Sequence, residues 1–229
     1  PGALAPSPNT TPDAAALQAT LASLRDAGAT SVAMEVSSHG LDQGRVNGVR
    51  FDVALFTNLT RDHLDYHGTM AAYGSAKARL FAWPGLRVAV INIDDAFGQR
   101  LADDVRARGT ELVTYGRISG DVHATAAASG EAGIALEVST PRGRGRVQTA
   151  LIGEFNVHNL LGTLGVLIAC DMPLADALAA LGRLAPPAGR MQRRGGDGKP
   201  TVVVDYAHTP DALDKVLAAL RPVAAEGGA

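Results

Sequence analysis

The most constraining feature of this sequence is the alternation of short apolar runs with segments whose apolar residues recur at helical spacing. Length and composition of the apolar runs predict β-strands at residues 31–36, 51–56, 88–93, 111–115 and 201–205. Helical spacing predicts helices at residues 13–27, 70–83, 96–108, 156–169, 174–184 and 209–220. Because parallel strands need long crossovers, which are usually helices, this alternation predicts a mostly parallel sheet with helices on its faces.

The pattern changes between residues 121 and 150. Runs of strand length at residues 122–128, 133–139 and 146–151 are joined by turns that contain glycine. They predict a small antiparallel subsheet. The predicted fold class is therefore α/β, with a mostly parallel central sheet flanked by helices and a small antiparallel subsheet. The Pro/Gly-rich residues 186–198 predict a break before the last strand and helix.

The composition excludes several classes of protein. Of the 229 residues, 46% are hydrophobic and 19% are charged, and the formal net charge is −2, as in globular rather than disordered chains. A chain without a concentrated basic surface is not expected to bind nucleic acid. No apolar run approaches the roughly 20 residues of a membrane helix, so we expect no membrane insertion. The single cysteine, Cys170, allows no internal disulfide and favours a reducing cytoplasm.

Two clusters of polar residues directly follow predicted strands. Ligands in α/β sheets bind at the carboxyl ends of strands, so these clusters are the first places to look for a site. The letters E-V-S-S-H-G cover residues 35–40, and T-N-L-T-R-D-H-L-D-Y-H covers residues 57–67. The first can be a polar turn with a capping serine, and the second can be a solvated charged turn. Two such clusters in one sheet favour a functional site.

The residue types in these clusters suit a hard cation. Magnesium takes oxygen ligands, often one or two carboxylates, together with phosphate oxygens and water. Glu35 can supply such an oxygen, and His63 can approach the same ion. Lys77 lies on the apolar side of the next predicted helix. Its ammonium can extend to the surface, or its amine can react with carbon dioxide to give a carbamate, an anionic metal ligand; the residues leave both interpretations open.

Three further polar segments adjoin predicted strands or helices. N-I-D-D at residues 92–95 is expected to cap the helix that follows. In the segment G-E-F-N-V-H-N, the amides of Asn156 and Asn159 can cap a helix or hydrogen-bond the edge of a base. Arg190 lies in a loop, either as an exposed surface residue or as a bidentate phosphate ligand.

The last polar segment, D-Y-A-H-T-P-D at residues 205–211, lies between a predicted strand and a predicted helix. The 229 residues contain no G-x-x-x-x-G-K-[ST] phosphate loop, no Cys/His zinc spacing and no G-x-S-x-G elbow. The residues alone therefore predict an α/β enzyme whose strand-end clusters suit metal and phosphate.

Taken in order, these segments resemble the Mur ligase family, and most closely its MurE type. The matching segments are residues 35–41, 57–68, 76–77, 92–95, 153–159, 189–191 and 205–211. The strings R-D-H-L-D-Y-H-G and D-Y-A-H-T-P-D are specific, whereas the segments that contain Asn92 and Arg190 are weak individually. The resemblance implies the central, ATP-binding domain of such a ligase.

The resemblance implies an ATP-dependent amide ligase of peptidoglycan synthesis. Its substrates would be UDP-N-acetylmuramoyl-L-alanyl-D-glutamate and an amino acid. The Gly/Ala/Arg-rich composition hints at a GC-rich bacterial source, which favours meso-diaminopimelate over L-lysine as that amino acid. In this family ATP phosphorylates the acceptor's free carboxylate, and the incoming amine attacks the acyl phosphate. Positioning and charge neutralisation then carry most of the catalysis. The alternatives are a folylpolyglutamate or cyanophycin synthetase with the same central domain, and a non-catalytic relative.

The resemblance also assigns roles by position. Glu35 and His63 match magnesium ligands, and Lys77 matches a lysine that is carbamylated to N6-carboxylysine and helps to hold a second magnesium; these three form the expected catalytic group. The expected ATP contacts are Asn156, Asn159, Arg190 and Asp205. The expected muramoyl-dipeptide contacts are Thr10, Thr11, Ser37, Gln43 and Arg45.

The resemblance divides the chain into an N-terminally truncated central domain, residues 1–204, and the truncated start of a C-terminal domain, residues 205–229. The fold is expected to be like that of P-loop NTPases but to lack the phosphate-loop segment, which in the family lies upstream. The family domain that selects the amino acid would continue beyond the last residue. We therefore expect these residues alone to be inactive, and we expect a monomer.

Overall fold

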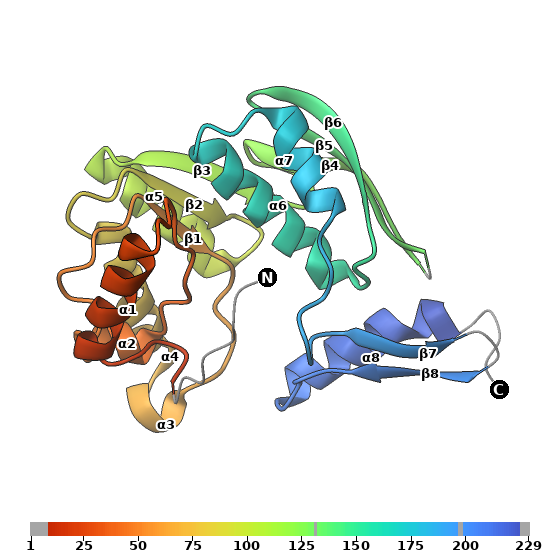
Figure 1. Ribbon diagram of the computed structural model, residues 1–229, viewed down its shortest axis with the longest axis horizontal. Coiled ribbons are helices and arrows are strands. Elements are labelled where there is room, and N and C mark those ends of the chain that lie inside the picture. The colour runs from red at the N-terminus through yellow and green to blue at the C-terminus, as the bar shows by residue number, and fades with distance from the viewer. Residues whose placement is uncertain (1–8, 131, 197–198, 225–229) are drawn as a thin grey trace.

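The computed structural model describes residues 9–130, 132–196 and 199–224. The first eight residues of the predicted central domain and the last five of the predicted C-terminal segment lie outside the described residues. The described chain forms a six-stranded sheet with helices on both faces, and a separate two-stranded sheet (Figure 1). Among the described helices, none has both the length and the apolar character needed to cross a bilayer.

The six-stranded sheet is parallel at one end and antiparallel at the other. Its strands, in spatial order, are β1 (Val53–Phe56), β2 (Val88–Asn92), β3 (Glu111–Gly116), β4 (Val122–Gly130), β5 (Gly133–Thr140) and β6 (Gly143–Thr149). Neighbours from β1 to β4 pair in parallel, and β4, β5 and β6 form an antiparallel meander. The predicted α/β class is confirmed, and the antiparallel part continues the parallel sheet through the β3–β4 pair.

The predicted helices are all present, and two short ones were not predicted. The helices are α1 (Ala14–Asp26), α2 (Ser38–Asp42), α3 (Leu64–His67), α4 (Met70–Ala78) with the 3-10 turn η1 (Arg79–Ala82), α5 (Ala96–Arg108), α6 (Glu154–Ala169), α7 (Leu174–Gly182) and α8 (Pro210–Ala224). The unpredicted helices, α2 and α3, lie inside the two polar strand-end clusters. They are too short to show helical periodicity in the sequence.

The two faces of the parallel half carry separate hydrophobic cores, because successive strand residues point to opposite sides. The central strand β2 is buried along its whole length. Its residues Val88 and Val90 belong to the core formed with α6 and α7, and its residues Ala89 and Ile91 belong to the core formed with α1 and α5. Figure 1 shows α6 and α7 on one side of the sheet and α1 and α5 on the other.

The prediction of a strand at residues 31–36 is wrong. No strand of the described chain pairs with this segment, and Val32 is 49% exposed. Single contacts hold it instead: the Thr11 hydroxyl donates to the Glu35 carbonyl at 3.1 Å and accepts from the Ser37 amide at 2.9 Å. An apolar run forms a strand only where a neighbouring backbone pairs with its amides and carbonyls.

The break expected at residues 186–198 also contains a strand. Strand β7 (Gln192–Gly196) pairs antiparallel with β8 (Lys199–Val204) and forms the second sheet. The register shifts between Arg194 and Gly196, where Gly195 has a φ of +86°. The glycine-rich sequence therefore makes an irregular hairpin, because glycine adopts left-handed backbone angles without steric cost.

Three glycines let helices lie close to the sheet. A Cβ atom at Gly98 of α5 would lie 1.9 Å from the Asn92 carbonyl oxygen. On α6, a Cβ at Gly162 would lie 2.9 Å from the Tyr115 ring, and one at Gly165 would lie 2.8 Å from Val90. Any larger residue at these positions would push its helix away from the strands.

Two arginines bind the carboxyl end of α6. Arg142, in the turn between β5 and β6, donates to the Ile168 carbonyl at 3.1 Å and to the Asp171 carboxylate at 2.7 Å. Arg87, at the start of β2, donates to the Ala169 carbonyl at 2.6 Å. The last carbonyls of a helix have no partner within the helix and carry partial negative charge, so guanidinium groups stabilise them.

We predict that Gly98→Ala destabilises the full-length protein by roughly 1–3 kcal/mol, the usual cost of overpacking. The added methyl group would meet the backbone oxygen of Asn92, which cannot move without disturbing the end of β2. Urea unfolding would measure the change. Gly130→Ala is the matched control, because a Cβ at Gly130 meets nothing within 4 Å. Equal stabilities of the two variants would contradict the prediction.

Candidate active site

Residues 92–95 hold the carboxyl ends of the strands together. The Asn92 side chain donates to the Thr57 carbonyl at 2.7 Å and so joins the ends of β2 and β1. The Asp95 carboxylate accepts from the Leu59 amide at 2.9 Å. Its other oxygen accepts from two amides in the first turn of α5, at 2.8 and 2.9 Å, so the predicted helix cap is confirmed. This segment therefore fixes both α5 and the polar loop that follows β1.

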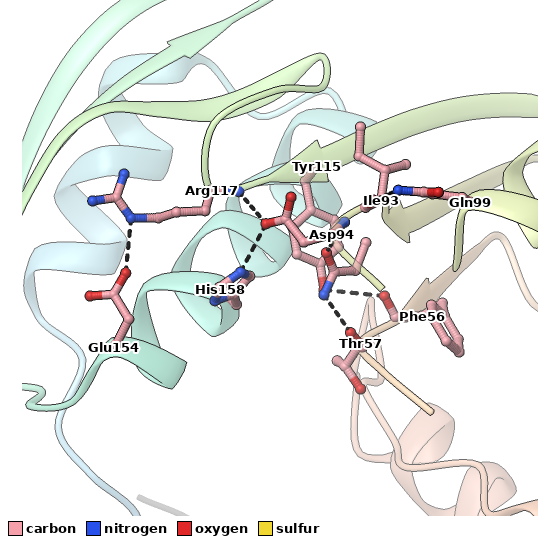
Figure 2. Close-up of polar contacts among 10 residues, drawn as sticks. Phe56, Thr57, Ile93, Asp94, Gln99, Tyr115, Arg117, Glu154 and His158 are labelled. Atoms are coloured by element: carbon pink, nitrogen blue, oxygen red, sulfur yellow. Dashed lines mark hydrogen bonds and ion pairs between the residues drawn. The ribbon is translucent and has the colours of Figure 1, made fainter. Parts of the chain in front are cut away.

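Asp94 connects the same edge of the sheet to α6. Its carboxylate accepts from the Arg117 amide at 2.5 Å and contacts the His158 Nε2 atom at 2.9 Å. The Arg117 side chain in turn pairs with Glu154, the first residue of α6, at 2.9 Å. Figure 2 shows these four side chains spanning the gap between the ends of the strands and the amino end of α6. The sequence analysis predicted none of these contacts.

The buried Tyr115 side chain forms a hydrogen bond to this edge of the sheet. The Tyr115 hydroxyl on β3 donates to the Phe56 carbonyl at the end of β1, at 3.1 Å. Burial, helped by the carboxylates of Asp94 and Asp95, raises the pKa of Tyr115 far above its usual value. The hydroxyl therefore remains protonated and keeps its role as a donor.

The residues expected to hold a metal come from three segments that lie close together. Glu35 precedes α2, His63 precedes α3, and Lys77 lies on α4. The Lys77 Nζ atom lies 5.1 Å from the centroid of the Tyr73 ring, and the His63 ring lies 5.6 Å from the same ring. The Glu35 carboxylate acts electrostatically on Lys77. The fold thus gathers these residues in one neighbourhood around α4.

Asp62 is a member of this neighbourhood that the sequence-based assignment missed. Its carboxylate accepts from the His63 amide at 2.8 Å and lies 3.7 Å from the His63 Nε2 atom. It also acts electrostatically on Lys77 and on Tyr73. His63 has a φ of +54°, a conformation that is uncommon for residues other than glycine and that directs its imidazole toward Tyr73. Asp62 adjoins the predicted ligand His63, which is the signal that could have identified it.

The electrostatics of Lys77 depend on two opposing effects. Burial lowers the pKa of the Lys77 ammonium below its usual value, and the carboxylates of Asp62 and Glu35 raise it by less. Burial disfavours the charged form because the interior solvates it poorly. At a given pH, Lys77 therefore carries more neutral amine than an ordinary lysine. The neutral amine is the form that reacts with carbon dioxide.

The residues expected at the muramoyl-dipeptide site form a second, hydrogen-bonded group. Arg45 donates to the Gln43 side chain at 2.8 and 2.6 Å and to the Thr11 carbonyl at 2.9 Å. The Thr11 hydroxyl accepts from the Ser37 amide at 2.9 Å, and Ser37 caps α2. Thr10 is exposed beside this group.

Tyr66 was missed by the sequence-based assignment and completes this group. Its hydroxyl donates to the Asp42 carboxylate at 2.9 Å and accepts from the Gln43 amide at 3.3 Å. Its ring contacts the His39 ring with centroids 4.1 Å apart and a tilt of 48° between the ring planes. Tyr66 belongs to the string R-D-H-L-D-Y-H-G, but its partners lie more than 20 positions away in the sequence. A contact of that range is not visible in local patterns.

The two asparagines expected at the adenine site lie in the first turns of α6. Asn156 donates to the Ile152 carbonyl at 2.8 Å, and Asn159 donates to the Asn156 side-chain oxygen at 2.9 Å. The capping alternative for these amides is wrong, because α6 begins after Gly153 with no side-chain cap bond. Asn159 is exposed and presents its amide away from the core.

Arg190 and Asp205 lie together beside the second sheet. The Asp205 carboxylate accepts from the amides of Met191 and Ala207, both at 2.8 Å. The Arg190 guanidinium stacks over the Tyr206 ring, 4.9 Å from its centroid. Arg190 is exposed, as its surface alternative expected, and its guanidinium contacts an aromatic face. The two motifs that carry Arg190 and Asp205 meet in space.

Comparisons with known proteins match both parts of the chain. A family model described as the Mur ligase middle domain matches residues 2–167, and one described as the Mur ligase glutamate ligase domain matches residues 189–228. A protein named UDP-N-acetylmuramoyl-L-alanyl-D-glutamate–2,6-diaminopimelate ligase from Pseudomonas aeruginosa is 58% identical over 226 residues, which is 98% of this chain and 46% of that protein. The protein of the same name from Ralstonia nicotianae is 56% identical, over 96% of this chain and 44% of its own length.

A solved structure of a ligase with the same name has the same fold. Its TM-score is 0.83 at 39% identity, over 95% of this chain and 45% of that chain. The chain therefore spans about half the length of the relatives that it matches.

We predict that Lys77 titrates below the ordinary lysine value of 10.5, because burial outweighs the two nearby carboxylates. Competitive labelling with acetic anhydride over a range of pH, read by mass spectrometry, would give its pKa in full-length protein freed of metal and carbon dioxide, where Lys77 is an unmodified amine. Asp62→Asn should lower that pKa further, since the Asp62 carboxylate raises it. A midpoint at or above 10.5, or a rise in the Asp62→Asn variant, would contradict the prediction.

Proposed function

Because this chain belongs to the Mur ligase family, we propose that it is the ATP-binding and acceptor-binding part of an amide ligase. The proposed acceptor is UDP-N-acetylmuramoyl-L-alanyl-D-glutamate, and the proposed added residue is meso-diaminopimelate, the substrates in the names of the relatives. The acceptor carboxylate takes the γ-phosphoryl group of ATP and releases ADP. The amine then attacks the acyl carbon, phosphate leaves, and an amide bond forms.

One observation carries this proposal: Glu35 belongs to two groups at once. Its carbonyl accepts from Thr11, which is bound to Arg45 and Ser37 in the proposed acceptor site. Its carboxylate raises the pKa of Lys77, which belongs to the proposed metal site. An acceptor carboxylate held by the first group would therefore lie beside the second, where phosphoryl transfer needs charge neutralisation.

The residues of the proposed metal site fit magnesium through their chemistry. Within the described chain no group of three or more His, Cys, Asp and Glu side chains is ready to hold a metal. The proposed set contains two such residues, Glu35 and His63. It gains a third ligand, a second source of oxygen beside Glu35, only when Lys77 is a carbamate. The lowered pKa of Lys77 favours that modification. Magnesium bound here would offset the charge of the transferring phosphoryl group.

The proposed ATP contacts divide between α6 and the second sheet. Asn159 keeps a side-chain oxygen and one N–H outside its bond to Asn156, and this pair of groups matches the edge of an adenine. Arg190 is the proposed phosphate contact, because a planar guanidinium binds phosphate oxygens in pairs. Asp205 is the proposed ribose or domain-junction residue, held by two backbone amides.

The proposed acceptor contacts are the hydrogen-bonded group described above with Thr10 beside it: Thr10, Thr11, Ser37, Gln43 and Arg45. Arg45 is the one cation among them and is oriented by two bonds to Gln43. A guanidinium fixed in this way suits a carboxylate or phosphate of the acceptor. Tyr66 and Asp42 would keep Gln43, and through it Arg45, in place.

Several expectations remain predictions. They are the division between residues 204 and 205, the inactivity of residues 1–229 alone, the cytoplasmic location and the monomeric state. The second family model begins at residue 189, before the hairpin β7–β8. The predicted boundary after residue 204 places this hairpin in the central domain, whereas the family model includes it in the C-terminal domain.

We predict that the full-length protein sustains ADP release over many turnovers only when ATP, magnesium, the muramoyl dipeptide and the amino acid are all present. Coupled measurement of ADP release would test this, with meso-diaminopimelate and L-lysine compared at equal concentration. Faster release with L-lysine would contradict the proposed added residue. Release with a folate or cyanophycin acceptor, and none with the muramoyl dipeptide, would contradict the proposed function.

We predict that Tyr66→Phe in the full-length protein raises the KM for the muramoyl dipeptide roughly threefold to tenfold and leaves the KM for ATP unchanged. The change removes one hydroxyl that holds Asp42 and Gln43, and a hydrogen bond of this kind contributes about 0.5–1.5 kcal/mol. Steady-state kinetics with each substrate varied would measure both values.

Tyr115→Phe is the control for Tyr66→Phe. It also removes a tyrosine hydroxyl, but one that supports the strand ends through the Phe56 carbonyl and does not contact the acceptor group. It should lower stability without a selective rise in the KM for the muramoyl dipeptide. The same selective rise in both variants would contradict the assignment of Tyr66.

A further inference from the structure

We propose that His158 is a positioning residue for nucleotide binding, acting through its contact with Asp94; this inference rests on the proposed function. His158 lies on α6 between Asn156 and Asn159, the proposed adenine contacts. Its Nε2 atom lies 2.9 Å from the Asp94 carboxylate, which belongs to the end of β2 (Figure 2).

Val157 buries the first turn of α6 in the core, and few polar contacts hold the same end. Gly153, the residue before the helix, has a φ of +92° and provides no side-chain cap. The side chains of His158 and Glu154 contact Asp94 and Arg117, which follow β2 and β3. The Gly153 amide also donates to the Ser129 hydroxyl of β4 at 3.2 Å, but this bond lies before the helix. The Arg117–Glu154 pair is an ion pair in which Glu154 is 62% exposed, so it contributes little.

Asp94 is suited to act as an anchor because it is itself held. Its carboxylate accepts the backbone amide of Arg117, and its own amide donates to the Asn92 side chain at 3.0 Å. The side chains of both His158 and Asp94 are about one-third exposed, at 30% and 33%, so their contact is partly shielded from water. Core packing sets the position of α6 as a whole, and an imidazole bound to a fixed carboxylate holds its first turns against the strand ends.

The orientation of these first turns determines where the amide of Asn159 points. Successive residues on a helix are about 100° apart, so His158 faces the strand ends while Asn159 faces outward. Asn156 fixes the side chain of Asn159 only relative to the helix. Without the contact to Asp94, the first turns of α6 are held less firmly, and the amide of Asn159 meets an adenine edge in more than one geometry.

Isothermal titration of the full-length protein with ADP tests the proposal, because it measures binding without turnover. We expect His158→Ala to raise the Kd for ADP about tenfold. His158→Gln places an amide donor where Nε2 was, and it should restore the Kd to within about twofold of the unchanged protein.

Arg142→Ala is the matched control, since it weakens the attachment of α6 at the opposite end, where Arg142 binds Ile168 and Asp171. It should lower the melting temperature and leave the Kd for ADP unchanged. A Kd for His158→Ala within twofold of the unchanged protein would overturn the proposal, and so would an equal rise in Arg142→Ala. If the unchanged full-length protein binds no ADP, the proposed function itself fails, which is a separate outcome.

Discussion

The rest of the structure depends on the close packing of α6 against the sheet. Leu160, Leu161 and Leu164 of this helix are at most 1% exposed. Burial of each contributes about 1.5–3 kcal/mol to stability. The two glycines that face the strands let the helix approach β1, β2 and β3 without a clash. Since arginines from two strand connections bind its carboxyl end, the position of α6 along the sheet is fixed as well.

This packing has a consequence for the candidate site. A helix anchored at its carboxyl end and along its length must present its amino end at the carboxyl edge of the parallel strands, where α/β proteins bind ligands. The segment at residues 92–95 lies at the same edge. Through Asn92 and Asp95 it holds the loop that leads to His63, and through Asp94 it holds α6. One short segment thus links the proposed metal site to the proposed nucleotide site.

Much of the fold could be predicted from the sequence, because strand and helix periods report which residues are buried. The prediction was wrong at residues 31–36, since apolar character does not reveal whether a partner strand is present. It missed β7 because glycine and arginine give no strand signal. Clusters of site residues were visible as polar strings, but Tyr66 and Asp94 were not given roles, since their partners lie 23 to 64 positions away in sequence. Such pairs exist only once the chain has folded.

The charges around Lys77 imply that its proposed modification and metal binding are coupled. As an ammonium, Lys77 is attracted by Asp62 and Glu35, and burial opposes that charge. Conversion to a carbamate replaces one positive charge with a negative one, so three anions would then share a partly buried neighbourhood. Repulsion among like charges in such a place is costly, because water screens it poorly. A divalent cation would remove that cost, so the carbamate would be stable only together with the cation that it binds, and the proposed site would assemble from both at once.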